Sequence, residues 1–237
     1  MIIYGMNPVL DSINLYFDKI KKIYLSKKTF NKFNKNQLKK IKNLPIIYIS
    51  EGDFKNLTQS NNHQSIAAEI KIDSVKALGD LKKNIASLGS VLILDHVQDP
   101  QNIGALSRTC VFFGISNIIL PNDRTASISP GSVKSSAGAI FSINFYQVSN
   151  LLNTIKLLKE NDYWIIGADL KGEDYQDFKF DKFIGENVVF VIGSESKGLS
   201  SLIRNNCDIL LRINGNGSTD SLNVNVAAGI LFSRFSD

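Results

Sequence analysis

Residues 188–198 read VVFVIGSESKG and begin with the most apolar strand-length run in the chain. Five consecutive apolar residues rich in valine and isoleucine predict a strand that is buried on both faces, as in a parallel sheet. The loop that follows has Gly193 and Gly198 around small polar residues, so its backbone amides can approach a polar ligand. Ligands of parallel sheets bind beyond the carboxyl ends of the strands. We therefore expect an α/β fold with a binding loop at residues 193–198.

The same alternation of strands and helices extends over residues 89–237, which we take as one domain. The predicted strands are 91–94, 117–120, 143–148, 164–168, 188–192 and 209–213, and the predicted helices are 103–113, 131–140, 151–159, 199–205 and 224–235. Strands that alternate with helices favour a parallel sheet with helices on both faces.

Residues 1–72 predict a smaller α/β domain, and residues 73–88 predict a linker. Its predicted strands are 23–26, 46–49 and 65–72, and its predicted helices are 7–13, 32–42 and a short one that begins near 52. Asn7 is a candidate N-cap because Pro8 follows it.

Positive charge is concentrated in the N-terminal third. Residues 1–72 hold 12 lysines, no arginine and five acidic residues, and no acid lies between Lys19 and Lys42. Lysines suit phosphate backbones, so an RNA-binding surface and an ordinary solvated face both remain open. The candidate RNA-binding residues are Lys19, Lys21, Lys22, Lys27 and Lys28.

Composition excludes several other classes. The 237 residues are 43% hydrophobic and 21% charged, and they contain no apolar run of about 18 residues such as a membrane helix needs. We expect no secretory signal and a cytoplasmic protein. Cys110 and Cys207 belong to no metal or redox motif, and with only two histidines we expect no metal site.

Two further loops carry polar side chains after predicted strands. In residues 95–108, Asn102 can cap a helix and Arg108 follows it by between one and two helical turns. In residues 213–229, Ser221 and Asn223 precede a helix with small residues. Each loop also has a purely structural interpretation, and Glu195 could simply interact with a helix N-terminus. The GNG run at 215–217 is a poor dinucleotide fingerprint, which disfavours an oxidoreductase.

Taken together, the three loops resemble the motifs of the SpoU (TrmH-type) RNA ribose methyltransferases, of the knotted SPOUT class. The matching motifs are Asn-x-Gly-x-x-x-Arg at 102–108, Gly-x-Glu-x-x-Gly at 193–198 and Ser-Leu-Asn-Val-x-Val-Ala at 221–227. The resemblance covers about residues 88–237. Residues 5–9 and 63–66 are similar to the ribosomal-protein-like substrate-binding domain of some members.

The resemblance implies a C-terminal trefoil knot, which is a rare exception to unthreaded chains, and a homodimer with active sites near its interface. It implies S-adenosylmethionine as the cofactor, with Gly193, Ile213 and Leu222 at the family's contact positions. The residues that match the catalytic group are Asn102, Arg108, Glu195, Ser221 and Asn223.

The implied reaction is methylation of a ribose 2′-hydroxyl, with a guanosine of 23S rRNA as the favoured target. The alternatives are a tRNA ribose methyltransferase and an inactive RNA-binding protein of the same fold. Arg108 acts either as a general base or, since a guanidinium rarely loses its proton, as an electrostatic and phosphate-binding group. Family members commonly have Ile-Pro-Met where this chain has residues 213–215, and Gly where it has Ser196.

Overall fold

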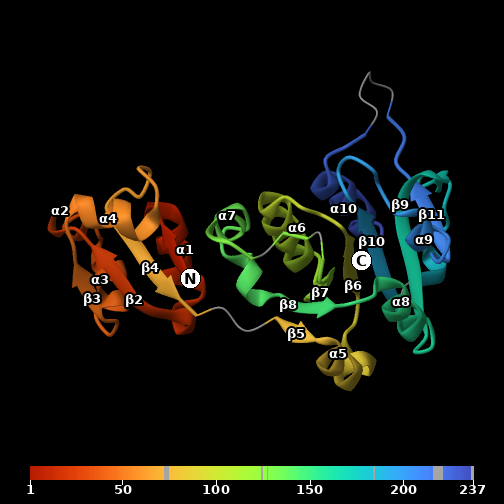
Figure 1. The fold of residues 1–237 in the computed structure, drawn as a ribbon, viewed down its shortest axis with the longest axis horizontal. Coiled ribbons are helices and arrows are strands. Elements are labelled where there is room, and N and C mark those ends of the chain that lie inside the picture. Colours follow the sequence, from red (N-terminus) through yellow and green to blue (C-terminus); the bar gives the residue numbers. More distant parts are fainter. Residues whose placement is uncertain (72–74, 124, 127, 184, 216–220, 236–237) are drawn as a thin grey trace.

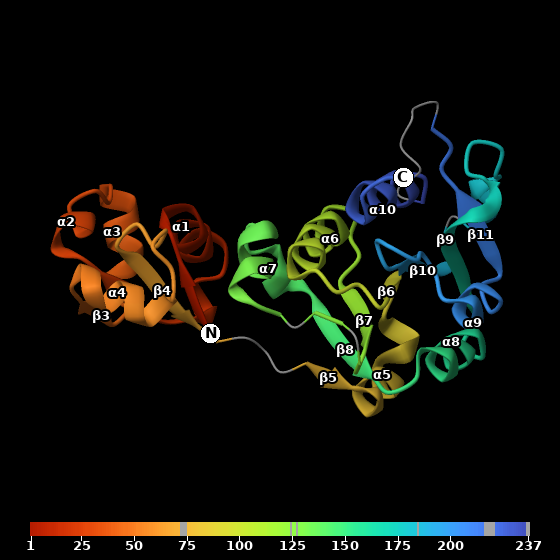
Figure 2. The same ribbon diagram turned by 45° about the horizontal axis from the view of Figure 1, so that its top comes forward.

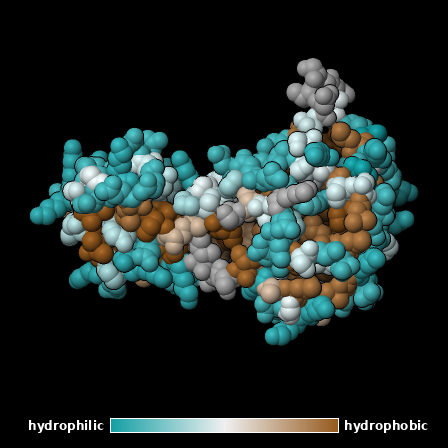
Figure 3. Space-filling view, viewed as in Figure 1, coloured by the Kyte–Doolittle hydropathy of each residue, from teal (hydrophilic) through white to brown (hydrophobic). Residues whose placement is uncertain are grey.

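The computed structural model describes residues 1–71, 75–123, 125–126, 128–183, 185–215 and 221–235. They form two lobes that are joined at a narrow waist (Figures 1 and 3). The smaller lobe contains a four-stranded sheet and the larger lobe contains a seven-stranded sheet. Hydrophilic side chains project around the rim of the smaller lobe in Figure 3.

The smaller lobe is a mixed sheet with the strand order β1-β4-β2-β3, in which β4 runs antiparallel to β1 and β2, and β3 runs parallel to β2. Its elements are β1 (Ile2–Tyr4), α1 (Met6–Leu15), η1 (Phe17–Lys19), β2 (Ile20–Leu25), α2 (Lys27–Phe30), α3 (Lys35–Ile41), β3 (Ile46–Tyr48), α4 (Glu51–Thr58) and β4 (Ile66–Ile70).

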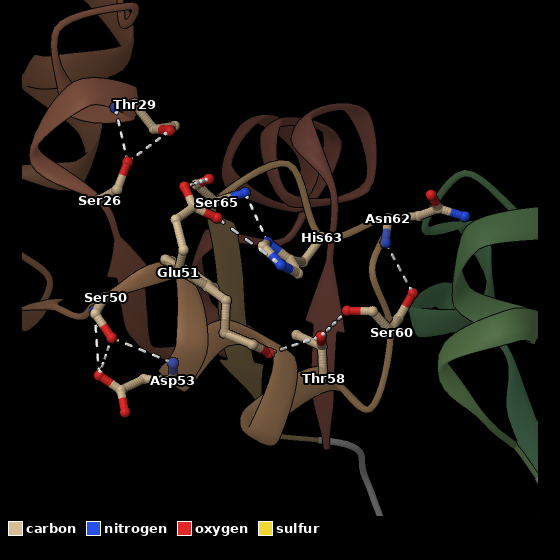
Figure 4. A network of polar contacts seen from close by, with 11 residues as sticks. Ser26, Thr29, Ser50, Glu51, Asp53, Thr58, Ser60, Asn62, His63 and Ser65 are labelled. Atoms are coloured by element: carbon tan, nitrogen blue, oxygen red, sulfur yellow. Dashed lines mark hydrogen bonds and ion pairs between the residues drawn. The ribbon is translucent and has the colours of Figure 1, made fainter.

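Local hydrogen bonds fix the helix ends of the smaller lobe, and Figure 4 shows several of them. Ser50 and Asp53 form a capping box at the start of α4. His63 stacks on Phe54 with 5.2 Å between ring centroids, and its Nδ1 accepts a hydrogen bond of 3.0 Å from the backbone N–H of Ser65. These contacts give His63 a structural role, because they anchor the loop before β4.

Two helices of the smaller lobe begin at other residues than predicted. Residues 32–42 are not one helix, because Asn34 accepts a hydrogen bond from the N–H of Gln37 and starts α3 there. The N-cap of α1 is Gly5 and not Asn7. Pro8 falls within the first turn, where a missing N–H costs nothing because it has no partner inside the helix.

The larger lobe is a parallel sheet with the order β11-β9-β10-β6-β7-β8-β5, which confirms the predicted α/β class. Its elements are β5 (Lys76–Ala77), α5 (Leu78–Asn84), η2 (Ile85–Ser87), β6 (Val91–Asp95), α6 (Pro100–Phe112), β7 (Asn117–Pro121), α7 (Pro130–Ser135), η3 (Ala139–Ser142), β8 (Asn144–Val148), α8 (Leu151–Lys159), β9 (Tyr163–Asp174), η4 (Phe180–Phe183), β10 (Asn187–Gly193), α9 (Ser201–Arg204), β11 (Ile209–Arg212) and α10 (Val224–Phe232).

Helices cover both faces of this sheet, as Figure 2 shows. One core lies between the sheet and α6 and α10, and it contains Leu92 and Leu94. The other core lies between the sheet and α5, α8 and α9, and it contains Val91 and Ile93. Adjacent residues of β6 thus point into different cores, which explains why the strand is apolar at every position.

Both cysteines are thiols in apolar surroundings. Burial raises the pKa of the Cys110 thiol, and it raises the pKa of Cys207 to about 12. Both side chains are therefore protonated at neutral pH. Among the described residues, no helix is both long enough and apolar enough to cross a bilayer.

An aromatic pair and a glycine lie at the waist between the lobes. Tyr16 packs against Phe141 with 5.2 Å between ring centroids, and its hydroxyl lies 3.3 Å from the hydroxyl of Ser142. Gly138 has a φ of +84°, and a Cβ there would come within 2.9 Å of the Tyr16 ring. A side chain at Gly138 would therefore push the two lobes apart.

Helices α6 and α7 approach each other most closely at Gly104. A Cβ at this position would lie 2.0 Å from the Ser135 hydroxyl and 2.2 Å from the Ser132 carbonyl oxygen. Gly104→Ala should therefore lower the stability of the larger lobe by about 1–3 kcal/mol, the usual cost of overpacking. Urea denaturation followed by far-ultraviolet circular dichroism measures the change.

Gly79→Ala is the matched control, because a Cβ at this α5 position meets nothing within 4 Å. It should leave stability unchanged or raise it by about 0.5–1 kcal/mol, since alanine favours the helix. Equal unfolding midpoints for the two variants would contradict the close contact at Gly104.

Candidate functional site

The three predicted loops meet at the carboxyl edge of the sheet. Strands β6 and β10 are neighbours, and their register pairs Gly193 with Asp95. The chain runs from β6 through β7 and β8 on one side of this pair, whereas β9 and β11 lie on the other side. The site thus forms beside a topological switch point, where ligands of parallel sheets bind.

A chain of hydrogen bonds links the three loops. The side-chain amide of Asn102 donates to Glu195 Oε1 at 2.6 Å, and the amide of Asn223 lies within 3.4 Å of Asn102 Oδ1. Asn223 Oδ1 in turn accepts from the backbone N–H of Asn225 at 2.9 Å, and Asn225 Oδ1 accepts from the Thr109 hydroxyl at 2.7 Å. These contacts hold β10's loop, α6 and α10 together.

The structure corrects the local roles of two of these residues. Asn102 does not cap α6, because Asp99 is the N-cap and accepts from the N–H of Gln101 at 2.8 Å. Glu195 is not at a helix start, because the next helix, α9, begins at Ser201. The side chains of Asn102 and Glu195 are instead free to bind each other.

Arg108 is exposed on α6 and faces a shallow hollow that Phe112 and Asn225 also line. Over the described part of the chain, its guanidinium has no hydrogen bond or ion pair. The structure therefore places Arg108 beside the polar chain, through the shared neighbour Asn225, and leaves its donors available to a substrate.

A cavity of about 430 Å³ adjoins the polar chain. Its lining includes Gly193, Ile213, Leu222, Ser221 and Glu195, so it brings together all three predicted cofactor-binding positions and two of the predicted catalytic ones. This volume falls within the range of about 300–1,000 Å³ that small-molecule sites occupy.

The loop at 193–198 folds back tightly at one side of this cavity. A Cβ on Gly193 would lie 2.1 Å from the carbonyl carbon of Gly198, and Gly198 itself has a φ of +64°. Ser194 and Gly198 exchange backbone hydrogen bonds of 3.1 and 2.8 Å. The two glycines are therefore required by the turn itself, and Ser196 is accommodated between them.

Sequence reasoning missed several residues of this site. Asp95 is buried, lies 2.6 Å from Nδ1 of His96 and accepts from the backbone N–H of Ser200 at 2.7 Å. Asp169 pairs with Arg204 at 2.7 Å in the cavity wall. Asp169 follows the predicted strand 164–168, so the carboxyl-end rule could have found it had the place of β9 beside β10 been known.

The five candidate RNA-binding lysines all lie in the smaller lobe, away from this cavity. Lys21 and Lys22 are partly neutralised by Glu69, at 3.7 and 3.1 Å. The hydrogen bond to Glu69 raises the pKa of Lys22. Lys27 and Lys28 are exposed on α2, and Lys19 ends η1. Among the described residues, no group of histidine, cysteine or acidic side chains is arranged to hold a metal ion.

Family comparisons agree with this combination of a parallel-sheet cavity and a separate basic lobe. The model of the SpoU rRNA methylase family matches residues 89–233, and the model for RNA 2′-O ribose methyltransferase substrate binding matches residues 2–75. The chain belongs to the SpoU rRNA methylase family. It is an S-adenosylmethionine-dependent RNA 2′-O-ribose methyltransferase, which confirms the predicted activity and cofactor.

Relatives and solved structures extend over nearly the whole chain. The 23S rRNA (guanosine-2′-O-)-methyltransferase RlmB of Nitrosomonas europaea is 31% identical over 98% of this chain and 90% of its own length, and that of Coxiella burnetii is 33% identical over 96% and 92%. The SpoU methyltransferase AviRb from Streptomyces viridochromogenes, in complex with AdoMet, shares the fold with a TM-score of 0.75 at 20% identity, covering 99% of this chain and 88% of that one.

Asp95 gives a test of how the site is held together. Replacing it by asparagine puts an NH₂ group where one carboxylate oxygen now accepts, facing either the Ser200 N–H or His96. Loss of such a buried hydrogen bond costs about 1–3 kcal/mol. In Asp95→Asn, amide hydrogen exchange over residues 193–200 should therefore accelerate about tenfold or more.

His96→Ala is the matched control, because it removes the other partner of Asp95 and keeps the bond to Ser200. Its exchange over residues 193–200 should stay near that of the unmodified protein. Fast exchange in the control alone would show that His96, and not Asp95, anchors the loop.

Proposed function

We propose that this enzyme methylates the 2′-hydroxyl of a guanosine in 23S rRNA. The full-length relatives in Nitrosomonas europaea and Coxiella burnetii, which carry that activity in their names, support the choice of RNA. The structural observation that supports the proposal is the hydrogen-bond chain from Glu195 through Asn102 to Asn223, close to the exposed side chain of Arg108.

The cavity at the carboxyl edge is the proposed cofactor site. Gly193, Ile213 and Leu222 would hold S-adenosylmethionine, and the folded-back loop at 193–198 leaves backbone surface where a side chain would otherwise intrude. The cofactor supplies an electrophilic methyl group on a sulfonium sulfur. The residues around the cavity therefore need only to bind, orient and exclude water, and alignment of this kind can contribute about 7–11 kcal/mol.

Arg108 is the proposed contact to the target nucleotide. A guanidinium rarely loses its proton, so Arg108 acts by holding a phosphate and by stabilising negative charge on the 2′-oxygen. Asn102 and Glu195 position the ribose, and Ser221 and Asn223 form the wall of the site. The shared neighbour Asn225 keeps these residues in register with α6.

The smaller lobe is the proposed RNA-binding domain, at residues 1–72. Among the described residues, Lys27 and Lys28 form no ion pair, whereas Lys21 and Lys22 share Glu69. Residues 73–88 connect it to the methyltransferase domain at 89–237, and within this connection β5 and α5 pack on the larger lobe. Contacts of this kind supply affinity without reading sequence.

The assembly is proposed to be a cytoplasmic homodimer with a knotted C-terminus. Phe112 on α6 is 82% exposed and Val226 on α10 is 47% exposed, which favours cover by a second copy. From the edge strand β11 the chain returns to pack α10 on α6, where Thr109 binds Asn225. That return path supports a threaded end, and α10 joins the active site to the dimer face.

Transfer of labelled methyl groups to an unmodified 23S rRNA transcript tests the activity. One site in the RNA should become resistant to alkaline cleavage, because a methylated 2′-oxygen cannot attack its phosphate. Arg108→Ala should lower the rate by about 10²–10³, the usual cost of one oxyanion-stabilising donor. Lys156→Ala, an exposed change on α8 at the opposite face of the sheet, should have little effect.

Label without alkali resistance would mean base methylation and would contradict the reaction. Transfer to tRNA in place of the 23S transcript would keep the reaction and replace the substrate. Bound cofactor without transfer to either RNA would favour an inactive RNA-binding protein.

Phe112 tests the proposed dimer. Phe112→Asp places a charge in an apolar interface, so sedimentation velocity at micromolar concentration should show monomers where the unmodified protein shows dimers. Leu202→Asp is the matched control, since Leu202 is 57% exposed on α9, on the other face of the sheet. A dimer that survives Phe112→Asp, or that only Leu202→Asp breaks, would place the interface elsewhere.

A further inference from the structure

Charge in the proposed cofactor cavity is unevenly balanced. Four cationic side chains line it, and two acidic ones. The cationic ones are Lys171, Lys197, Arg204 and Arg212. Asp169 is already bound to Arg204, and Glu195 is bound to Asn102. The cavity therefore presents cationic groups that no acidic group of the described lining neutralises.

Arg212 lies at the end of β11, where backbone pairing with β9 holds it in place. Its backbone carbonyl accepts from the N–H of Tyr175 at 2.9 Å, and β11 pairs it with Asp174 on β9. Its Nε is buried and has no hydrogen-bond partner among the described residues. A buried donor of a charged group that stays unpaired costs at least about 1–3 kcal/mol, so this arrangement is suited to an anion that arrives with a ligand.

We propose that Arg212 binds the α-carboxylate of the amino-acid part of S-adenosylmethionine. This inference rests on the assignment of the cavity as the cofactor site. Of the charged groups of that molecule, the sulfonium and the ammonium are cations, and the carboxylate is the one anion. A guanidinium offers a planar pair of donors that matches a carboxylate.

A phosphate of the RNA is the less suitable partner. Arg212 is half-buried at the end of β11, in a cavity that it shares with the folded-back loop at 193–198. Arg108, by contrast, is exposed on α6 and open to a bulky polyanion. The two arginines thus divide the anions between them, with the cofactor's carboxylate at Arg212 and the RNA backbone at Arg108.

Two ligands that differ in the amino-acid part separate this role from a general one. S-adenosylhomocysteine carries the carboxylate, and 5′-methylthioadenosine has the same nucleoside without it. Binding of each to the full-length protein is measured by isothermal titration calorimetry. Arg212→Met should weaken the binding of S-adenosylhomocysteine by roughly 10- to 100-fold, as expected for loss of a charge-assisted hydrogen bond. The affinity for 5′-methylthioadenosine should stay within about twofold of that of the unmodified protein, which also shows that the variant is folded.

Lys171→Met removes the same charge from an exposed part of the lining, and it should lower the affinity for S-adenosylhomocysteine at most about fivefold. Arg212→Lys keeps the charge without the planar donor pair. Its affinity for S-adenosylhomocysteine should lie between those of the unmodified protein and Arg212→Met. This order of affinities supports pairing with the carboxylate.

Several results would overturn the proposal. Equal losses for both ligands would give Arg212 a structural role, and equal losses in Arg212→Met and Lys171→Met would reduce it to general electrostatics. A loss of RNA affinity alone would assign it to phosphate. If the unmodified protein bound neither ligand, the assignment of the cavity as cofactor site would fail first, which distinguishes that failure from a wrong role for Arg212.

Discussion

The parallel pairing of β6 with β10 is the constraint on which the site depends. It sets Asp95 beside Gly193, so a buried carboxylate at the end of one strand can hold the N–H of Ser200 beyond the loop of the next. The loop can fold back this far because Gly193 has no side chain where Gly198 passes. A shift of one residue would turn Asp95 away, since alternate residues of a strand face opposite sides.

A chain of hydrogen-bonded polar side chains runs from this edge of the sheet to the last helix. The Asn102–Glu195 contact bridges two strand-to-helix connections, and Asn223 and Asn225 continue it into the last helix. The side-chain amides of Asn102 and Asn223 each donate one hydrogen bond and accept another along this path, so each is oriented from both sides. One end of the chain of contacts borders the cavity and the other borders Arg108, and the sheet thereby aligns two binding regions.

The sequence was sufficient to predict those elements that a local pattern of residues determines. The buried strands at 91–94, 117–120 and 188–192 are unmistakable because both of their faces are apolar. It did not find β1, whose three residues show no period, and it ended β9 several residues early, where the strand becomes polar. It predicted that the three loops meet at one edge of the sheet, where Asn102 and Glu195 lie in contact. It did not single out Asp169 and Arg212, because their place in the cavity lining depends on strand order. That order is set by packing between distant segments, which one sequence does not reveal.

The waist at Tyr16 and Gly138 gives this enzyme the character of two linked binding modules. Interfaces between the domains of one chain resemble transient protein–protein interfaces, so relative motion of the lobes is the default expectation. Once RNA touches the basic lobe, its contact with the larger lobe becomes intramolecular, and the strength of that second contact is governed by an effective concentration. Two individually weak binding contacts to a folded RNA can then together give tight binding, provided that the RNA spans both lobes.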